Sequence, residues 1–253
     1  MLDYLVLISA AFLAGILNTI AGGGTFLTFP ALVYTGIAPV AANATSAVAV
    51  FPGYLGGAAG FRRELDCFDQ RNLIKAVCLT LIGGLIGSLL LLFSSNDAFS
   101  AIVPFLLLLA TLAFAFDERI QEWARNSRFG VRHNGALGII LVSIYGGYFN
   151  GGLGIVLLAL FSLWGMQDIN LMNGLKNALS LVLSAISVAT FAVAGIVAWQ
   201  QALIMMLAAV LGGYAGAPLA RALGRSVIRG IVIIMGATMS AVFFVRLVPW
   251  GQN

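Results

Sequence analysis

The side chains best able to bind a ligand lie beside two glycine-rich interruptions in an otherwise apolar chain, at 21–24 and 150–154. Amides and hydroxyls can hydrogen-bond an oxyanion without adding a net charge. A helix that begins after a glycine break directs its backbone N–H groups and its positive dipole end at an anion. The sequence therefore predicts a binding site for a small anion. The residues predicted to form it are Asn18, Gly22, Gly23, Gly24, Thr25, Asn43, Thr45, Ser46, Asn150, Gly152, Gly154, Lys176, Asn177 and Ser180.

Four of these residues form two matched pairs. Asn18 and Asn150 precede the two breaks, and Asn43 and Asn177 follow them in later apolar runs. Buried amides are costly without partners, so two symmetric pairs beside two breaks favour a functional role. A lone Ser or Thr in a membrane helix more often bonds one helix to another.

Lys176 is the charged side chain nearest to the predicted site, and two interpretations of it stay open. It is either a ligand for the anion or a lysine that extends to the membrane surface beside Asp168. All nine acidic residues lie outside the predicted spans, and the chain has one histidine and two cysteines. Metal and haem sites therefore lack ligands, and we expect no cofactor, no metal and no enzymatic activity.

The composition predicts that these residues are held in a membrane. Hydrophobic residues make up 61% of the 253 residues and charged residues 9%, whereas a soluble domain has about 25% charged residues. The basic residues lie in short loops, which indicates membrane topology and excludes a nucleic-acid partner. Six apolar runs have the length of about 20 residues that a spanning helix needs, and two further regions are broken by glycine. The runs are 43–61, 73–93, 99–116, 174–198, 200–220 and 226–248, and the broken regions are 4–33 and 135–165.

Three short matches in the same order predict an internal duplication. Residues 15–18 match 147–150, residues 43–46 match 177–180, and the glycine pattern at 83–87 recurs at 212–216. The predicted domains are a first membrane repeat at 1–116, a cytoplasmic linker at 117–134 and a second membrane repeat at 135–253.

The predicted fold is an all-α polytopic membrane protein with two inverted repeats, each a Gly-broken helical hairpin plus three transmembrane helices. An odd number of crossings per repeat inverts the second one. This arrangement places twelve of the thirteen basic residues on the inner side and both termini outside, as the positive-inside rule favours. The charges do not separate a re-entrant hairpin from a pair of short spanning helices.

The segment 15–32, GILNTIAGGGTFLTFPAL, followed by ANATS at 42–46, resembles the TauE/SafE family of sulfite and organosulfonate exporters. The second-half echo at 147–154 and 176–180 belongs to the same pattern, and the resemblance covers essentially the whole chain. It implies a secondary transporter for a small sulfur-containing anion in the bacterial inner membrane, linked to the proton gradient, and the charge distribution then predicts both termini in the periplasm. The alternative is a passive anion channel for small oxyanions. The identity of the anion, the direction of transport and the oligomeric state stay open.

Overall fold

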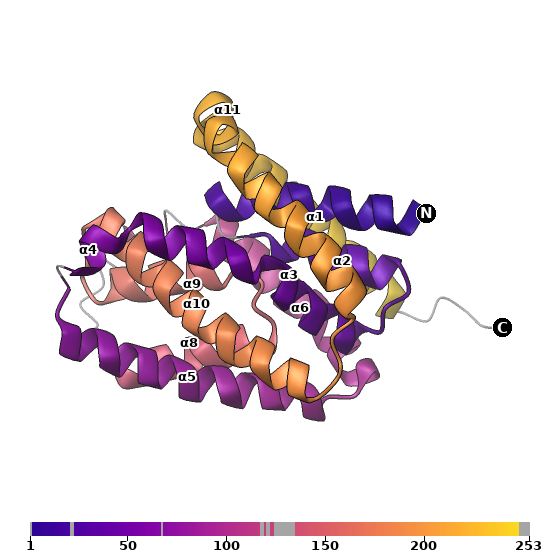
Figure 1. Cartoon of the computed structure of the whole chain (residues 1–253), viewed down its shortest axis with the longest axis horizontal. Helices are drawn as coiled ribbons and strands as arrows, with labels where there is room; N and C mark the ends of the chain where they lie inside the picture. The colour runs from indigo at the N-terminus through magenta and orange to yellow at the C-terminus, as the bar shows by residue number, and fades with distance from the viewer. Residues whose placement is uncertain are drawn as a thin grey trace.

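The computed structural model describes residues 2–20, 23–66, 68–116, 119, 122–123 and 135–247. Within these ranges the chain forms helices joined by short turns, with no strand, so the predicted all-helical class is confirmed there (Figure 1). The predicted linker at 117–134 lies almost wholly outside the described residues. The helices are α1 (Leu2–Ile20), α2 (Thr25–Tyr34), α3 (Pro39–Gly60), α4 (Arg62–Asp66), α5 (Gln70–Phe93), α6 (Asn96–Ala115), α8 (Ala136–Tyr148), α9 (Leu153–Leu163), α10 (Ile169–Val193) and α11 (Trp199–Leu247).

The two predicted breaks separate α1 from α2 and α8 from α9. In the second break Asn150 has φ 60° and Gly152 has φ 71°, both in the left-handed region. A right-handed helix cannot continue through that conformation, which Gly and Asn tolerate better than other residues. The Tyr145 hydroxyl donates a hydrogen bond to the Gly151 carbonyl and so ties the break back to α8.

The prediction of two separate spans at 200–220 and 226–248 differs from the structure, which is helical from Trp199 to Leu247. Met205 and Phe243 nevertheless belong to the same buried cluster. A straight helix would place them about 57 Å apart at about 1.5 Å per residue. Helix α11 therefore folds back on itself, as Figure 1 shows, and its two arms take the places of the two predicted spans.

Among the described residues, two helical segments are long and apolar enough to cross a membrane by length and composition. They are α5 and residues 170–193 of α10, and the other apolar segments that pass the composition test are shorter. Large apolar side chains also lie exposed on the outside of the bundle, as Phe93 and Leu207 show.

The order of helices in the first half recurs in the second, and the packing exchanges them between halves. Helix α1 packs on α11, and α8, which occupies the corresponding place in the second half, packs on α5. In the same way α3 contacts α11 and α10 contacts α5, while α3 and α10 contact each other. The first arm of each broken helix, α1 or α8, therefore packs mainly on the other half of the chain, while α2 and α9 also contact their own half.

Glycines make these exchanged contacts very close. A Cβ at Gly212 would lie 1.9 Å from the Phe12 carbonyl oxygen, and one at Gly87 would lie 2.1 Å from the Ile144 carbonyl oxygen. Because backbone meets backbone there, no larger residue fits without a shift. The close packing predicted for the glycine pattern is confirmed at Gly212 and Gly87, whereas the surroundings of Gly216 lie outside the described residues.

Helices α3 and α10 run antiparallel. The Cβ of Phe61, at the end of α3, lies 3.1 Å from where a Cβ at Gly174 would stand, near the start of α10. At the other end, the Thr45 hydroxyl accepts a 3.0 Å hydrogen bond from the backbone N–H of Ala198, just after α10. The start of each helix therefore lies beside the end of the other.

Candidate anion-binding site

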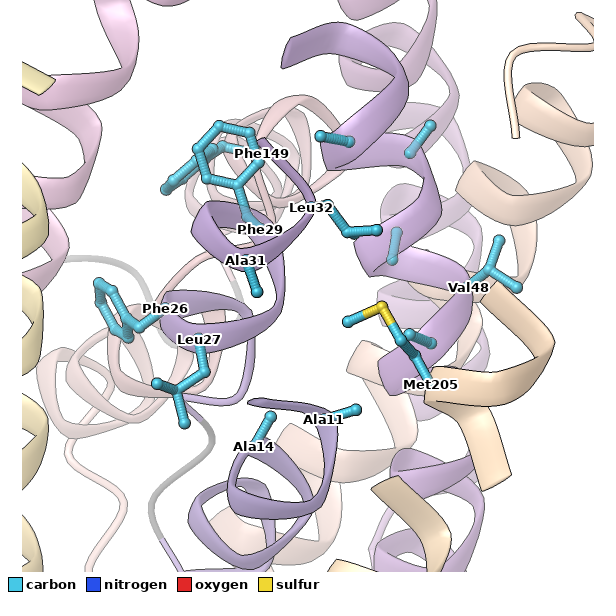
Figure 2. Close-up of a cluster of buried hydrophobic side chains, with 14 of the residues drawn as sticks. Ala11, Ala14, Phe26, Leu27, Phe29, Ala31, Leu32, Val48, Phe149 and Met205 are labelled. Atoms are coloured by element: carbon cyan, nitrogen blue, oxygen red, sulfur yellow. The ribbon is translucent and has the colours of Figure 1, made fainter. Parts of the chain in front are cut away.

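The two helix breaks meet inside the bundle. The Phe26 ring, in the first turn of α2, comes within 3.8 Å of where a Cβ at Gly152 would lie. The rings of Phe29 and Phe149 pack edge to face with centroids 5.9 Å apart, and Figure 2 shows the two side by side. Aromatic side chains therefore occupy the space between the breaks, which the sequence did not lead us to expect.

Helices α2 and α9 both begin without a side-chain cap. Their N-cap residues are Gly24 and Gly152, and neither supplies a hydrogen-bonding side chain. Several of the first N–H groups bond to carbonyls at the breaks, as Leu27 does to Gly24 and Ile155 to Gly152, so a ligand there would meet mainly the positive dipole ends of the two helices. Thr25, Gly23 and Gly154 are buried at these helix starts, while Gly22 lies outside the described residues.

Asn150 is the predicted site residue whose polar atoms are least satisfied. Its side chain is 5% exposed, and neither the amide oxygen nor the amide nitrogen has a hydrogen-bond partner in the protein. The Tyr54 hydroxyl lies close enough to interact with this amide, without a hydrogen bond of normal geometry. A buried unpaired donor costs about 1–3 kcal/mol. The Asn150 amide is therefore well suited to donate to a bound ligand.

Asn18 approaches α3 at the turn that also lies beside Asn150. Its amide nitrogen lies 3.0 Å from where a Cβ at Gly53 would stand, so the glycine leaves room for the amide. Gly53 directly precedes Tyr54, the residue beside Asn150. The symmetric pair Asn18 and Asn150 thus converges on one turn of α3, although the sequence did not point to Gly53 or Tyr54.

The predicted residues near the start of α3 bond within the protein. The Asn43 amide nitrogen donates to the Tyr148 carbonyl at 2.9 Å, which ties α3 to the second break. Thr45 donates to the Ala41 carbonyl at 2.6 Å. The remaining unpaired atom of Asn43 is Oδ1, an acceptor that would not attract an anion. These side chains position the breaks and offer an anion little.

Ser46 has a comparable bonding role. Its hydroxyl lies 2.6 Å from the Thr28 hydroxyl, and both side chains are buried. The Thr28 hydroxyl also lies 3.3 Å from the Gly24 carbonyl, to which it donates. This chain of hydrogen bonds links α3 to the start of α2.

Asn43 and Asn177 do not come together. Since Phe61 is level with Gly174 and the helices are antiparallel, Asn177 is level with residue 58 of α3. Asn43 lies 15 residues earlier, or about 22 Å along the helix at about 1.5 Å per residue. One small anion cannot bind both amides in this conformation.

Lys176 lies near the start of α10, where its ammonium bonds to a side chain of the same helix. Its ammonium donates to Asn173 Oδ1 at 3.0 Å. Asp168 instead caps α10 by accepting from the Asn170 backbone N–H at 2.9 Å. The Asp168 carboxylate therefore caps the helix start, and both interpretations of Lys176 stay predictions.

Ser180 is buried with 1% exposure, and its hydroxyl has no hydrogen-bond partner in the protein. The same holds for Ser184 and Ser187, which the sequence analysis did not select. Their spacing of i, i+4 and i+7 puts all three on one helix face. That spacing is visible in the sequence, but it is equally common in helices that simply pack closely.

Two cavities lie away from these residues. An apolar groove of about 610 Å³ runs between α1 and α11, lined by residues such as Phe12 and Leu207. A cavity of about 10 Å³ beside Lys75 and Trp164 has room for about one water molecule. Neither is lined by a predicted site residue.

Comparison with known proteins identifies the family of the chain. The family profile described as "Sulfite exporter TauE/SafE" matches residues 7–243. A "Probable membrane transporter protein" of Haemophilus influenzae is 29% identical over 238 residues, covering 93% of this chain and 92% of that protein. The "Probable membrane transporter protein YfcA" of Escherichia coli K12 is 29% identical over 249 residues, covering 93% and 87%. The "Probable membrane transporter protein ORF9" of Sinorhizobium sp is 27% identical over 231 residues, covering 91% and 88%. No solved structure matches.

Proposed function

Because the chain belongs to the TauE/SafE family and is a membrane transporter of that family, we propose that it moves a small sulfur-containing anion, such as sulfite or an organosulfonate, across the bacterial inner membrane. The observation that carries the proposal is the buried, unpaired amide of Asn150 between two uncapped helix starts. Hydrogen-bond donors without a protein partner favour an acceptor-rich ligand, and an oxyanion has only acceptors.

Each group at the break has a distinct task in this mechanism. Helices α2 and α9 direct their positive dipole ends at the anion. The Asn150 amide nitrogen donates to one oxyanion oxygen, and Asn18 does the same from the first half. Asn43, through the Tyr148 carbonyl, holds the second break in register with α3. The aromatic rings of Phe26 and Phe149 exclude water between the breaks.

Transport follows from alternating access between two inverted repeats, at 1–116 and 135–253. Support comes from the exchanged packing of corresponding helices and from the antiparallel course of α3 and α10. Corresponding helices of inverted repeats run in opposite directions, and such repeats can open a central site to either side in turn. The proposal places both termini in the periplasm and links transport to the proton gradient.

The experiment measures uptake of labelled sulfite and of an alkanesulfonate into proteoliposomes, with and without an imposed pH gradient. A coupled transporter gives saturable uptake that responds to the gradient and shows counterflow. A passive channel, the alternative, gives uptake with neither property. Absence of uptake of both anions by folded protein would refute the substrate assignment.

Two variants of Asn150 test its role without disturbing the backbone. Asn150→Gly removes the amide, and glycine accepts the left-handed φ of 60°. Asn150→Asp keeps the shape but replaces the donor with a negative charge. Loss of one hydrogen bond to a charged group, worth about 1.5–3 kcal/mol, lowers kcat/KM by about 10- to 150-fold in the glycine variant. The aspartate variant should be less active still, and wild-type uptake in both would remove Asn150 from the site.

A further inference from the structure

Three serines of α10 form a buried hydroxyl surface that the arrangement described so far does not use. We call Ser180, Ser184 and Ser187 the serine face. They are 1%, 0% and 3% exposed, and none of the three hydroxyls has a hydrogen-bond partner in the protein. Each is therefore a donor with no acceptor within the protein.

Several buried helical hydroxyls elsewhere in the described chain do find partners, among them Ser88 and Thr111, whereas Thr80 of α5 is also unpaired. On the same helix, Thr190 donates to the Ile186 carbonyl at 2.8 Å. On α5, Ser88 is fully buried and donates to the Leu85 carbonyl at 3.0 Å. Such bonding to the preceding turn is the usual outcome for Ser and Thr in a helix. Three consecutive exceptions on one face indicate that an acceptor from outside the protein completes them.

The serine face points away from the apolar packing of its own half. Leu175, Leu179 and Leu183 line one side of α10 and belong to the second buried cluster. Phe191 belongs to the first cluster, which contains much of α3. At about 100° per residue, Ser184 and Ser187 lie within about 40° of Phe191 around the helix. The hydroxyls are thus directed toward the first cluster.

Asn150 lies at the same level of the bundle. Because α3 and α10 are antiparallel with Phe61 level with Gly174, Tyr54 is level with residue 181. Tyr54 is the residue whose hydroxyl interacts with the Asn150 amide. From the other side, a Cβ at Gly146, one turn before Asn150, would lie 3.0 Å from Leu183. Two independent contacts therefore place the unpaired amide beside the segment that carries the unpaired hydroxyls.

Lys176 is the charged side chain nearest along α10 to the serine face and lies one turn before Ser180. Lys176 lies two turns before Ser184, and its ammonium is directed to Asn173, toward the start of the helix. Neutral donors can replace the hydration of an anion but cannot cancel its charge. The cost of moving an ion out of water rises steeply with its charge, so such a site accepts one negative charge far more readily than two.

We propose that the serine face and the Asn150 amide together form the hydrogen-bonding wall of the anion site and select singly charged oxyanions over doubly charged ones. This inference rests on the proposed transport function and names its selectivity. An alkanesulfonate, with three oxygens and one charge, fits the donor set, whereas sulfate, with two charges, does not.

The test uses full-length protein in proteoliposomes and compares Ser184→Ala, Ser187→Ala and the double variant with Ser88→Ala. Alanine keeps the close helix packing and removes only the hydroxyl, and Ser88 is an equally buried serine whose hydroxyl is already bonded. We expect kcat/KM for an alkanesulfonate to fall at least tenfold in the double variant and to stay within twofold in Ser88→Ala. A double variant within twofold of wild type would overturn the role of the serine face.

Selectivity is measured by competition. Unlabelled methanesulfonate should inhibit alkanesulfonate uptake by the wild type at a concentration at least ten times lower than sulfate does, and equal inhibition would overturn the charge selection. If the wild type moves no sulfur-containing anion, the proposed substrate is wrong. The serine face is then tested by measuring whether nitrate or formate raises the Tm of the wild type and of the double variant. Stabilisation of the wild type but not of the double variant supports the serine face, and equal behaviour of the two overturns it.

Discussion

Replacing Gly212 by alanine tests whether the exchanged glycine contacts hold the fold together. A Cβ at this position would lie 1.9 Å from the Phe12 carbonyl oxygen, which belongs to the backbone of α1. An ordinary contact needs about 3.4 Å, so α1 and α11 must move apart. Such overpacking costs about 1–3 kcal/mol, and a backbone obstacle that cannot rotate away puts this case near the upper end.

The measurement is the apparent Tm of the purified protein in detergent. For a chain of this size about 1 kcal/mol corresponds to about 2–4 °C, so Gly212→Ala should lower Tm by about 4–12 °C. Gly56→Ala is the matched control, because this glycine is also helical but a Cβ there meets nothing within 4 Å. That control should raise stability by about 0.5–1 kcal/mol. Equal Tm values for the two variants would refute the importance of the close contact.

Three further perturbations separate local roles. Thr28→Val removes the hydrogen bond to Ser46 and should lower the free energy of unfolding by about 1 kcal/mol. If that bond causes the loss, the double variant with Ser46→Ala is no less stable than Ser46→Ala alone, whereas additive losses would contradict this. Gly152→Ala should lower Tm more than Gly195→Ala: both glycines have φ near +70°, but only at Gly152 would a Cβ come within 2.9 Å of the Ala110 Cβ. A similar loss in both would show that backbone strain alone acts there. Lys176→Met should leave the KM for the anion within about twofold, because the ammonium bonds to Asn173; a tenfold rise would make it a ligand.

The glycine breaks could be predicted from sequence because they depend on local chemistry. A cluster such as Gly22–Gly24 weakens a helix wherever it occurs, and Asn150 beside Gly151 and Gly152 favours left-handed backbone. The meeting of the two breaks also followed from the symmetry of the duplication. Both features are properties of short segments or of their order.

The composition of the site depended on long-range geometry and could not be predicted in the same way. Asn43 and Asn177 look equivalent in sequence, but α3 and α10 pack antiparallel, which puts the two residues far apart along the helix pair. Tyr54 carries no motif and acquires its place only because the second break packs beside α3. Nothing in a single sequence distinguishes Ser184, whose hydroxyl is unpaired, from Ser88, whose hydroxyl bonds within its own helix.

The exchanged packing of the broken helices has a consequence for how the chain is made. Helix α1 is synthesised before α11, and Gly212, which packs against Phe12, follows Phe12 by 200 residues. At about 5–20 residues per second the first helix waits about 10–40 s in the bilayer without its partner. The first half alone leaves α1 without the α11 surface on which it packs, although α1 and α2 also contact α3. Two separate half-chains would have to dimerise, each lending its broken helix to the other, before either could reach this structure.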